Sequence, residues 1–299
     1  MRIGIDLGGT KVSGVLMDDS GDIAARLRRE SPRGDYNATL TMLCDVIAEL
    51  TPTSHPDAPV GIGLPGTVSP ATGLIKNANS TWLIGQPFDR DLAERSGRRI
   101  RTANDADCFA LSEAVDGAGA DDRTVFGVIL GTGVGGGFVI DGRLLSGPNA
   151  IAGEWGHNPL PWMDHNRDPA HPCYCGKDGC IETYLSGRGL SAHFKARTGT
   201  ARRAEDVAGS DDEAARACMG EYTDRLARAL AHVINILDPE VVVLGGGLSG
   251  IDSLYRDVPG IWGRYVFSDT VETRLLKNRH GADSGVRGAA WLWPVGGNP

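Results

Sequence analysis

The chain has 299 residues, of which 41% are hydrophobic and 23% are charged, a composition typical of a globular protein large enough for two domains. Its formal net charge of −8, with no basic run, argues against a nucleic-acid partner, although backbone amides and magnesium can still neutralise a phosphate ligand. No apolar run approaches the ~18–20 residues of a membrane-spanning helix, and no secretory leader precedes the first predicted strand. We therefore expect a cytoplasmic protein that binds neither membrane nor nucleic acid.

The first residues predict a strand, a glycine-rich turn and a second strand. The strands are expected at 2–7 and 12–17, and a third at 23–27. The turn between the first two strands consists of Gly8, Gly9, Thr10 and Lys11. A Walker loop or a dinucleotide-binding fingerprint would instead be followed by a helix, so this order excludes the two commonest nucleotide folds. The apolar periodicity of residues 36–50 then predicts a helix.

A strand at 59–64 leads into a polar loop, residues 76–82. Its asparagines and hydroxyl groups, among them Asn79 and Ser80, lie beside the indole of Trp82. A sugar needs many directional hydrogen bonds and one apolar face, so this mixture suits a sugar-binding loop. A plain surface loop can have the same composition, and both interpretations stay open on these residues alone.

The segment 100–107 predicts a strand that breaks at Asn104 and Asp105, followed by a helix at 108–115. α/β proteins place ligand-binding groups where strands end and helices begin, so Asn104 and Asp105 are candidate site residues. Asp107 is interpreted as the N-cap of the helix.

The opening pattern recurs about 120 residues later. Residues 126–133 match residues 3–10 when Gly4 is aligned with Gly127, and a second strand follows in both copies. Two facing glycine turns could bind a polyphosphate through backbone N–H groups, although two unrelated hairpins would give the same pattern. The second turn consists of Gly131, Thr132 and Gly133. Asp6 corresponds to Ile129, which leaves one carboxylate in the presumed cleft, where it could hold Mg²⁺.

The last third of the chain predicts a core helix at 221–237, a buried strand at 241–244 and a short apolar helix at 284–293. The strand ends in a third glycine turn, made of Gly245, Gly246 and Gly247. Such a turn lets a flat ligand approach the backbone, and we expect adenine or ribose there.

A candidate metal loop spans residues 153–182. One histidine and three cysteines supply four ligands, the number that a tetrahedral structural zinc needs: His157, Cys173, Cys175 and Cys180. Gly176 and Gly179 would let the backbone double back toward one ion. Three unrelated thiols or a disulfide are the alternatives, but the Cys-x-Cys-x₄-Cys spacing strains a disulfide. Glu154 and Glu182 bracket the ligands, so a bound ion would fix both acids relative to each other.

Three motifs together resemble the ROK family of repressors and sugar kinases. They are residues 6–11 (DLGGTK), 154–157 (EWGH) and 173–182 (CYCGKDGCIE), within a resemblance that covers essentially the whole chain. It implies the α/β, actin-like (ribonuclease-H-like) ATPase fold, with two domains around a central cleft. We expect residues 1–117 plus 285–299 to form the N-terminal domain and 118–284, with the zinc loop 153–182, the C-terminal domain. The resemblance also implies a homodimer.

The resemblance implies an ATP-dependent sugar kinase with Mg²⁺ and a structural Zn²⁺. Asp105 would then be the general base, and the residue patterns described above add Mg²⁺ at Asp6 and ATP at the three glycine turns. The family's sugar ligands would be Asn104, Glu154, His157 and Glu182, and the zinc ligands would be His157, Cys173, Cys175 and Cys180. The polar loop adds Asn79 and Ser80 to the expected sugar ligands, and the base Asp105 would also contact the sugar. His157 would present one ring nitrogen to zinc and the other to the sugar.

The sugar itself stays open between branches of the family. Residues 77–82, 85–89, 156–162 and 285–291 are similar to the fructokinase branch, so fructose is the first expectation. Residues 131–137 and 184–189 are similar to the N-acetylglucosamine kinase branch, whose substrate needs room for an acetamide beside Trp82. Glucose and mannose are further alternatives. A sugar-responsive regulator is a remote alternative, because no room for a helix-turn-helix precedes Asp6. A non-catalytic sugar-binding or zinc protein is the third class, and such a protein would not need the acid at Asp105.

Overall fold

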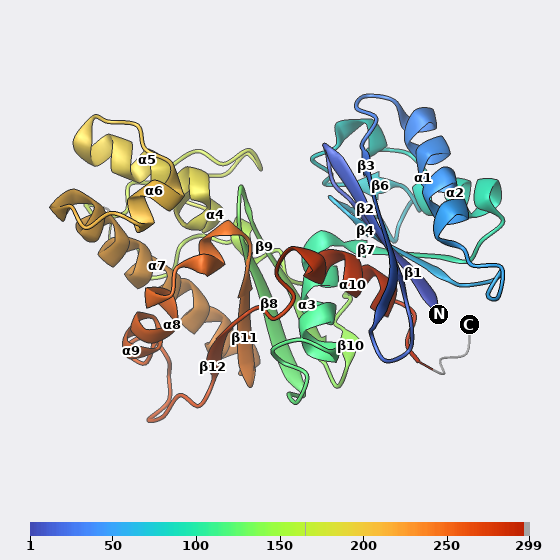
Figure 1. Cartoon of the computed structure of the whole chain (residues 1–299). Helices are drawn as coiled ribbons and strands as arrows, with labels where there is room; N and C mark the ends of the chain where they lie inside the picture. Colours follow the sequence, from blue (N-terminus) through green and yellow to red (C-terminus); the bar gives the residue numbers. More distant parts are fainter. Residues whose placement is uncertain (165, 296–299) are drawn as a thin grey trace.

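The computed structural model describes residues 1–164 and 166–295, which form two lobes, each built on a five-stranded sheet (Figure 1). The first sheet has the order β3-β2-β1-β4-β7 and the second the order β10-β9-β8-β11-β12. In each sheet the first three strands of the order pair antiparallel and the remaining pairs are parallel. The two sheets therefore share one topology, which confirms the strand–turn–strand repeat expected from the sequence.

The N-terminal lobe follows the predicted elements closely. Its sheet strands are β1 (Arg2–Leu7), β2 (Lys11–Met17), β3 (Ile23–Glu30), β4 (Val60–Leu64) and β7 (Ile100–Asn104). A small ribbon, β5 (Thr67–Val68) with β6 (Ile75–Lys76), and the turn η1 (Thr81–Leu83) follow β4. Helix α1 (Tyr36–Leu50) has the predicted bounds, because Asp35 caps it by accepting a hydrogen bond from the Ala38 amide. Its apolar face and α2 (Phe88–Ser96) form one core with the sheet.

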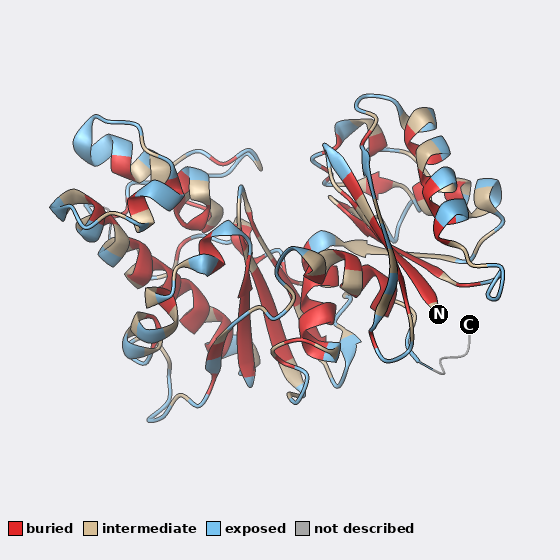
Figure 2. Ribbon diagram, in the orientation of Figure 1, coloured by how far each residue is buried: buried red, intermediate tan, exposed pale blue. Residues whose placement is uncertain are grey.

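The C-terminal lobe repeats the sheet and adds a layer of helices. The sheet strands are β8 (Thr124–Leu130), β9 (Val134–Ile140), β10 (Arg143–Leu144), β11 (Val241–Gly245) and β12 (Arg274–Lys277). The helices are α4 (Glu182–Leu185), α5 (Gly187–Thr198), α6 (Ala204–Ala208), α7 (Glu213–Leu237), α8 (Ser253–Asp257) and α9 (Pro259–Trp262), with short 3-10 turns η2 (Trp155–His157), η3 (Gly247–Gly250) and η4 (Gly281–Asp283). Buried side chains of α7 share a core with β8 and β11. The central strands of both sheets are buried almost throughout (Figure 2).

Helices α3 (Asp105–Val115) and α10 (Ser284–Trp291) join the two lobes. α10 returns from the end of the chain to pack on β1 and β4, while α3 packs on β8 and β9. Gly288 makes their close contact possible, because a Cβ there would lie 1.6 Å from the carbonyl oxygen of Cys108. Side chains of α3, α10, β8 and β11 form a third core between the sheets. The predicted domain limits, 1–117 plus 285–299 and 118–284, remain a prediction.

Two predicted helix starts are wrong. α3 begins at Asp105 and not at 108, and its N-cap is Asn104, whose side chain accepts from the Ala106 amide, so Asp107 is not the cap. α7 begins at Glu213 and not at 221, because Asp212 caps it through the Ala215 amide. In both cases a polar side chain before the predicted start satisfies a free amide of the helix terminus. Among the described helices, none combines the length and hydrophobicity that crossing a bilayer requires.

Candidate active site

A cavity of about 260 Å³ lies between the two lobes and collects residues from distant parts of the chain. Most of the predicted sugar ligands line this cavity, which we therefore call the sugar cavity: Asn79, Asn104, Asp105, Glu154, His157 and Glu182. The second glycine turn, Gly131 to Gly133, borders the same cavity. Ser80 does not line it. Ser80 is almost fully buried and lines a second, neighbouring cavity instead.

Asn104 and Asp105 stand where β7 ends and α3 begins, as the sequence predicted. The Ala106 amide donates to both Asn104 Oδ1 and Asp105 Oδ1, each at 2.8 Å. The Asn104 oxygen is therefore occupied by the helix cap, and its NH₂ group is the part free to meet a ligand. Asp105 keeps one carboxylate oxygen for the cavity.

Asp105 is open to solvent on the side that faces the cavity, and protein surrounds it on the other sides. This desolvation, followed by the negative charge of Asp6, and then that of Glu154, raises its pKa to about 6. A carboxylate with that pKa is largely ionised at neutral pH and still basic enough to accept a proton.

Asp107 is not among the residues that line the cavity. Its Oδ1 atom is buried and has no hydrogen-bond partner among the described residues. A Cβ added at Gly137 of β9 would lie 2.9 Å from that atom, so the Asp107 carboxyl faces the strand. Burial, and then the charges of Asp105 and Glu154, raise its pKa to about 7.

Glu154 and His157 are presented by a tight loop on β9. Trp155 between them is buried, stacks edge-on against Phe126 with ring centroids 5.5 Å apart, and donates from Nε1 to the Gly135 carbonyl at 3.0 Å. Gly153 has φ +88, and a Cβ there would lie 2.1 Å from the Gly136 carbonyl oxygen. The buried tryptophan and this glycine hold the loop against the strand, so its polar side chains face the cavity.

Four side chains of the metal loop converge as a tetrahedral site requires. One ligand atom from each of His157, Cys173, Cys175 and Cys180 lies within 4.8 Å of the others. His157 Nδ1 is 3.5 Å from Cys173 Sγ, and the sulfurs of Cys175 and Cys180 are 3.6 Å apart. These separations match the edges of a tetrahedron with Zn–N and Zn–S bonds of about 2.0 and 2.3 Å, which are ~3.5–3.8 Å long. The donor set thus fits zinc.

A disulfide and three unrelated thiols were the alternatives to a zinc site in this loop. All six cysteines lie in the described part of the chain, and each is a free thiol. Gly176 and Gly179 have φ of +85 and +72, so the expectation that glycines let the backbone double back is confirmed.

Glu182 connects the metal loop to the second glycine turn. It begins α4, and its Oε2 accepts from the Val134 amide at 2.9 Å. A Cβ at Gly133 would lie 2.7 Å from the same oxygen, and Gly133 does not have a positive φ. Gly133 is therefore not required for a left-handed backbone conformation. Gly133 provides room for Glu182, so a side chain there would disturb the sugar cavity directly.

A second cavity, of about 600 Å³, contains the first glycine turn. Asp6, Gly8, Gly9, Thr10, Ser80 and Gly246 line it together with Asp105. Burial raises the pKa of Asp6, an environment in which a cation would stabilise the charged form. Lys11 is exposed at the start of β2 and is not among the residues that line this cavity.

A third cavity, of about 690 Å³, joins the other two glycine turns. Gly131, Thr132 and Gly247 line it, together with Arg188 and Arg203. Gly245 does not border it, because it ends the buried strand β11, where a Cβ would meet the Phe109 ring at 2.4 Å. The structure therefore brings Gly246 and Gly247, but not Gly245, to a cavity.

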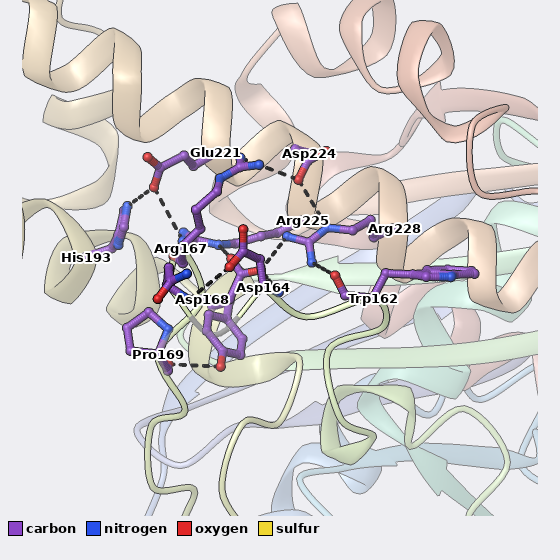
Figure 3. A network of polar contacts seen from close by, with 12 residues as sticks. Trp162, Asp164, Arg167, Asp168, Pro169, His193, Glu221, Asp224, Arg225 and Arg228 are labelled. Carbon is purple, nitrogen blue, oxygen red and sulfur yellow. Dashed lines mark hydrogen bonds and ion pairs between the residues drawn. The ribbon is translucent and has the colours of Figure 1, made fainter.

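An ion-pair network holds the spacer of the metal loop against α7 (Figure 3). Asp168 is 1% exposed and accepts from Arg225 Nε at 2.7 Å, while Arg228 Nη2 lies 2.9 Å from its other oxygen. The same guanidinium groups donate to the carbonyls of Arg167 and Trp162 at 2.7 and 2.9 Å. These contacts hold the described part of the spacer between His157 and Cys173 against α7.

Several residues of these cavities were not predicted as site residues. Pro65, Asn77, Ile129 and Tyr174 also line the sugar cavity. Tyr174 carried a usable signal, because it stands between two metal ligands. The two arginines of the third cavity carried none, since their distance from the glycine turns in sequence hides their position.

Comparison with known proteins finds relatives that match nearly the whole chain. A model of the ROK family matches residues 2–295. The N-acetyl-D-glucosamine kinase of Escherichia coli O139:H28 (strain E24377A / ETEC) is 38% identical over 299 residues, which cover 98% of this chain and 99% of the relative. The ROK hexokinase of Thermus thermophilus has a TM-score of 0.85 at 26% identity, covering 97% of this chain and 96% of that structure. A ROK family glucokinase of Streptomyces griseus, in complex with glucose and AMPPNP, has a TM-score of 0.78 at 26% identity, covering 97% and 98%. These similarities confirm the two-domain, actin-like ATPase fold.

Proposed function

The chain belongs to the ROK family and is a sugar kinase, and we propose that it transfers a phosphoryl group from ATP to N-acetylglucosamine. The observation that carries the choice of sugar is the 38% identity, over nearly the full length of both chains, to an N-acetyl-D-glucosamine kinase. Fructose, the first expectation from the sequence motifs, is not confirmed. The relatives support the alternative that the sequence left open.

The position of Trp82 is compatible with an amino sugar. Its indole Nε1 donates to Thr39 Oγ1 at 3.2 Å, and the ring lines the second cavity. It is not among the residues that line the sugar cavity. The concern that Trp82 would exclude an acetamide therefore has no support from its contacts.

Asp105 is the group we propose as general base. A sugar hydroxyl is a poor nucleophile at neutral pH, so its proton must move to a base as the bond to phosphorus forms. Asp105 offers a free carboxylate oxygen to the cavity and has a pKa of about 6. The Asn104 amide, Glu154, His157 and Glu182 would hold the remaining hydroxyl groups, which fixes the orientation of the reacting one.

The nucleotide is proposed to bind across the second and third cavities. Backbone amides of the first two glycine turns would contact its phosphates, and Gly246 and Gly247 would border the adenosine. Mg²⁺ bound near Asp6 would neutralise charge that develops on the transferred phosphoryl group. Lys11 and Gly245 belong to the predicted set, but their positions give that prediction no support.

Zinc is proposed as a structural ion held by His157, Cys173, Cys175 and Cys180. With four protein ligands it would have no open coordination position, so it would supply folding energy to the loop rather than chemistry. Coordination through His157 Nδ1 would leave the Nε2 proton available as a donor.

The deciding experiment is ADP release by the purified chain with Mg²⁺ and ATP over N-acetylglucosamine, glucose, mannose and fructose. We expect the highest kcat/KM for N-acetylglucosamine, and the amino sugar to win in competition with fructose at equal concentration. Preferred phosphorylation of fructose would overturn the choice of sugar but would agree with the assignment as a sugar kinase. Sugar binding without ADP release from any sugar would instead favour the sugar-responsive regulator.

We also propose a homodimer and a cytoplasmic location, on the family resemblance alone. Light scattering coupled to size-exclusion chromatography would distinguish a mass near twice 31.6 kDa from the monomer.

A further inference from the structure

We propose that Tyr174 is a sugar-binding residue that donates a hydrogen bond from its hydroxyl group to an oxygen of the substrate. The inference rests on the proposed function, because it assumes a sugar in the cavity between the lobes. Tyr174 lines that cavity together with Asp105, Glu154 and Glu182. Its side chain is 76% exposed, which is unusual for a large aromatic residue in the middle of a metal loop.

The geometry around His157 determines which way the Tyr174 hydroxyl can point. Tyr174 Oη lies 2.9 Å from His157 Nε2, and the two rings meet edge-on with centroids 5.1 Å apart. His157 Nδ1 faces Cys173 Sγ at 3.5 Å, inside the metal cluster. A ligating Nδ1 has no proton, so the neutral imidazole carries its proton on Nε2 and donates it to the tyrosine oxygen.

The tyrosine hydroxyl then accepts from His157 and keeps its own proton for another acceptor. Within the described residues, its one hydrogen-bond partner is the His157 ring. The space in front of it is the cavity, whose occupant on the proposed function is rich in hydroxyl and carbonyl oxygens. Among the sugar ligands proposed above, His157 would therefore reach the sugar through the Tyr174 hydroxyl group and not directly. The tyrosine ring would form part of the cavity wall.

A competing interpretation makes Tyr174 a gate. In that case the tyrosine would block His157 Nε2 and would have to leave before the sugar could bind to the histidine. The two interpretations predict opposite effects of removing the hydroxyl group. Loss of a donor weakens sugar binding, whereas loss of a gate strengthens it.

The test compares Tyr174→Phe with wild type by isothermal titration calorimetry against N-acetylglucosamine and glucose, without ATP. One neutral hydrogen bond contributes about 0.5–1.5 kcal/mol, so we expect sugar binding to weaken roughly 2–12-fold. The KM for sugar should rise by a similar factor with kcat and the KM for ATP unchanged, because the contact exists before and during the reaction. Weakening with both sugars places the acceptor on a shared hydroxyl group, and weakening with N-acetylglucosamine alone places it on the acetamide.

Two controls separate this contact from damage to the loop. Zinc content, measured by mass spectrometry, should equal that of wild type in Tyr174→Phe. Tyr36→Phe removes a comparable phenol hydrogen bond, to Asp91 at 2.8 Å, far along the N-terminal lobe, and should leave sugar affinity unchanged. Wild-type affinity or tighter binding in Tyr174→Phe, with an active wild type, would overturn the inference alone. A wild type that binds none of the sugars would overturn the proposed function as well.

Discussion

Asp107→Asn is expected to stabilise the protein in a pH-dependent way. Asp107 is half-buried, its Oδ1 atom lies buried against β9 without a hydrogen-bond partner in the described chain, and its pKa is raised to about 7. The ordinary value is 3.8, so the shift is about three units in the direction that disfavours the charged form. An amide of the same shape removes the charge and keeps the packing.

The magnitude follows from the difference between the folded and unfolded pKa. Each unit corresponds to about 1.4 kcal/mol, so above pH 8 ionised Asp107 lowers the free energy of unfolding by about 4 kcal/mol. Because the folded pKa is the higher one, the folded protein takes up the proton first as the pH falls through 7. The destabilisation then shrinks to about 2 kcal/mol at pH 5.5.

The assay is denaturant unfolding of wild type and Asp107→Asn at pH 5.5 and 8.5. We expect the variant's stability advantage to grow by about 2 kcal/mol between these pH values. A buried amide has its own desolvation cost, but that cost does not depend on pH and cancels in the comparison. Asp121→Asn, at an exposed position, is the matched control and should show no such growth. A stability advantage that is the same at both pH values would refute the inference that Asp107 ionises in the folded protein between them.

Further expectations concern the base, the metal and the network. Asp105→Asn should lower kcat by roughly 10²–10⁴-fold with little change in zinc content or melting temperature, and the acid limb of the wild-type pH–rate profile should have an apparent pKa of about 6. A variant that keeps a tenth of wild-type kcat would exclude this role. Cys175→Ser should lose the bound zinc, measured by mass spectrometry, and raise the KM for sugar more than that for ATP; full zinc retention would contradict the ligand assignment. Asp168→Ala should destabilise the protein by about 3–5 kcal/mol, because it removes the buried carboxylate that Arg225 and Arg228 share and leaves them only the more exposed Glu221 and Asp224. Thermal unfolding near the wild-type temperature would show that the network is dispensable.

Features that depend on neighbouring residues could be predicted from the sequence. Local spacing, cap residues and glycine positions record the bounds of α1, the strand–turn–strand repeat and the cluster of one histidine and three cysteines. Asn104 and Asp105 were predicted at the mouth of a cleft because a strand ends and a helix begins there. The helix start was missed because Asn104 and Asp107 are both good caps, and the one nearer the strand satisfies the free amides first.

Features that depend on packing between distant segments were decided by the tertiary structure. Gly133 reads as a phosphate-turn residue, but its contact with Glu182, 49 positions later, makes it part of the sugar cavity. Gly288 reads as a weak point in a helix, yet it is where α10 crosses α3. Asp168 and its arginines are 57 or more positions apart, so no local pattern could pair them. The sequence determines local conformation and ligand chemistry, because these depend on spacing of a few residues. Which groups share a cavity depends on how two sheets and two crossing helices pack, and that is a property of the folded chain.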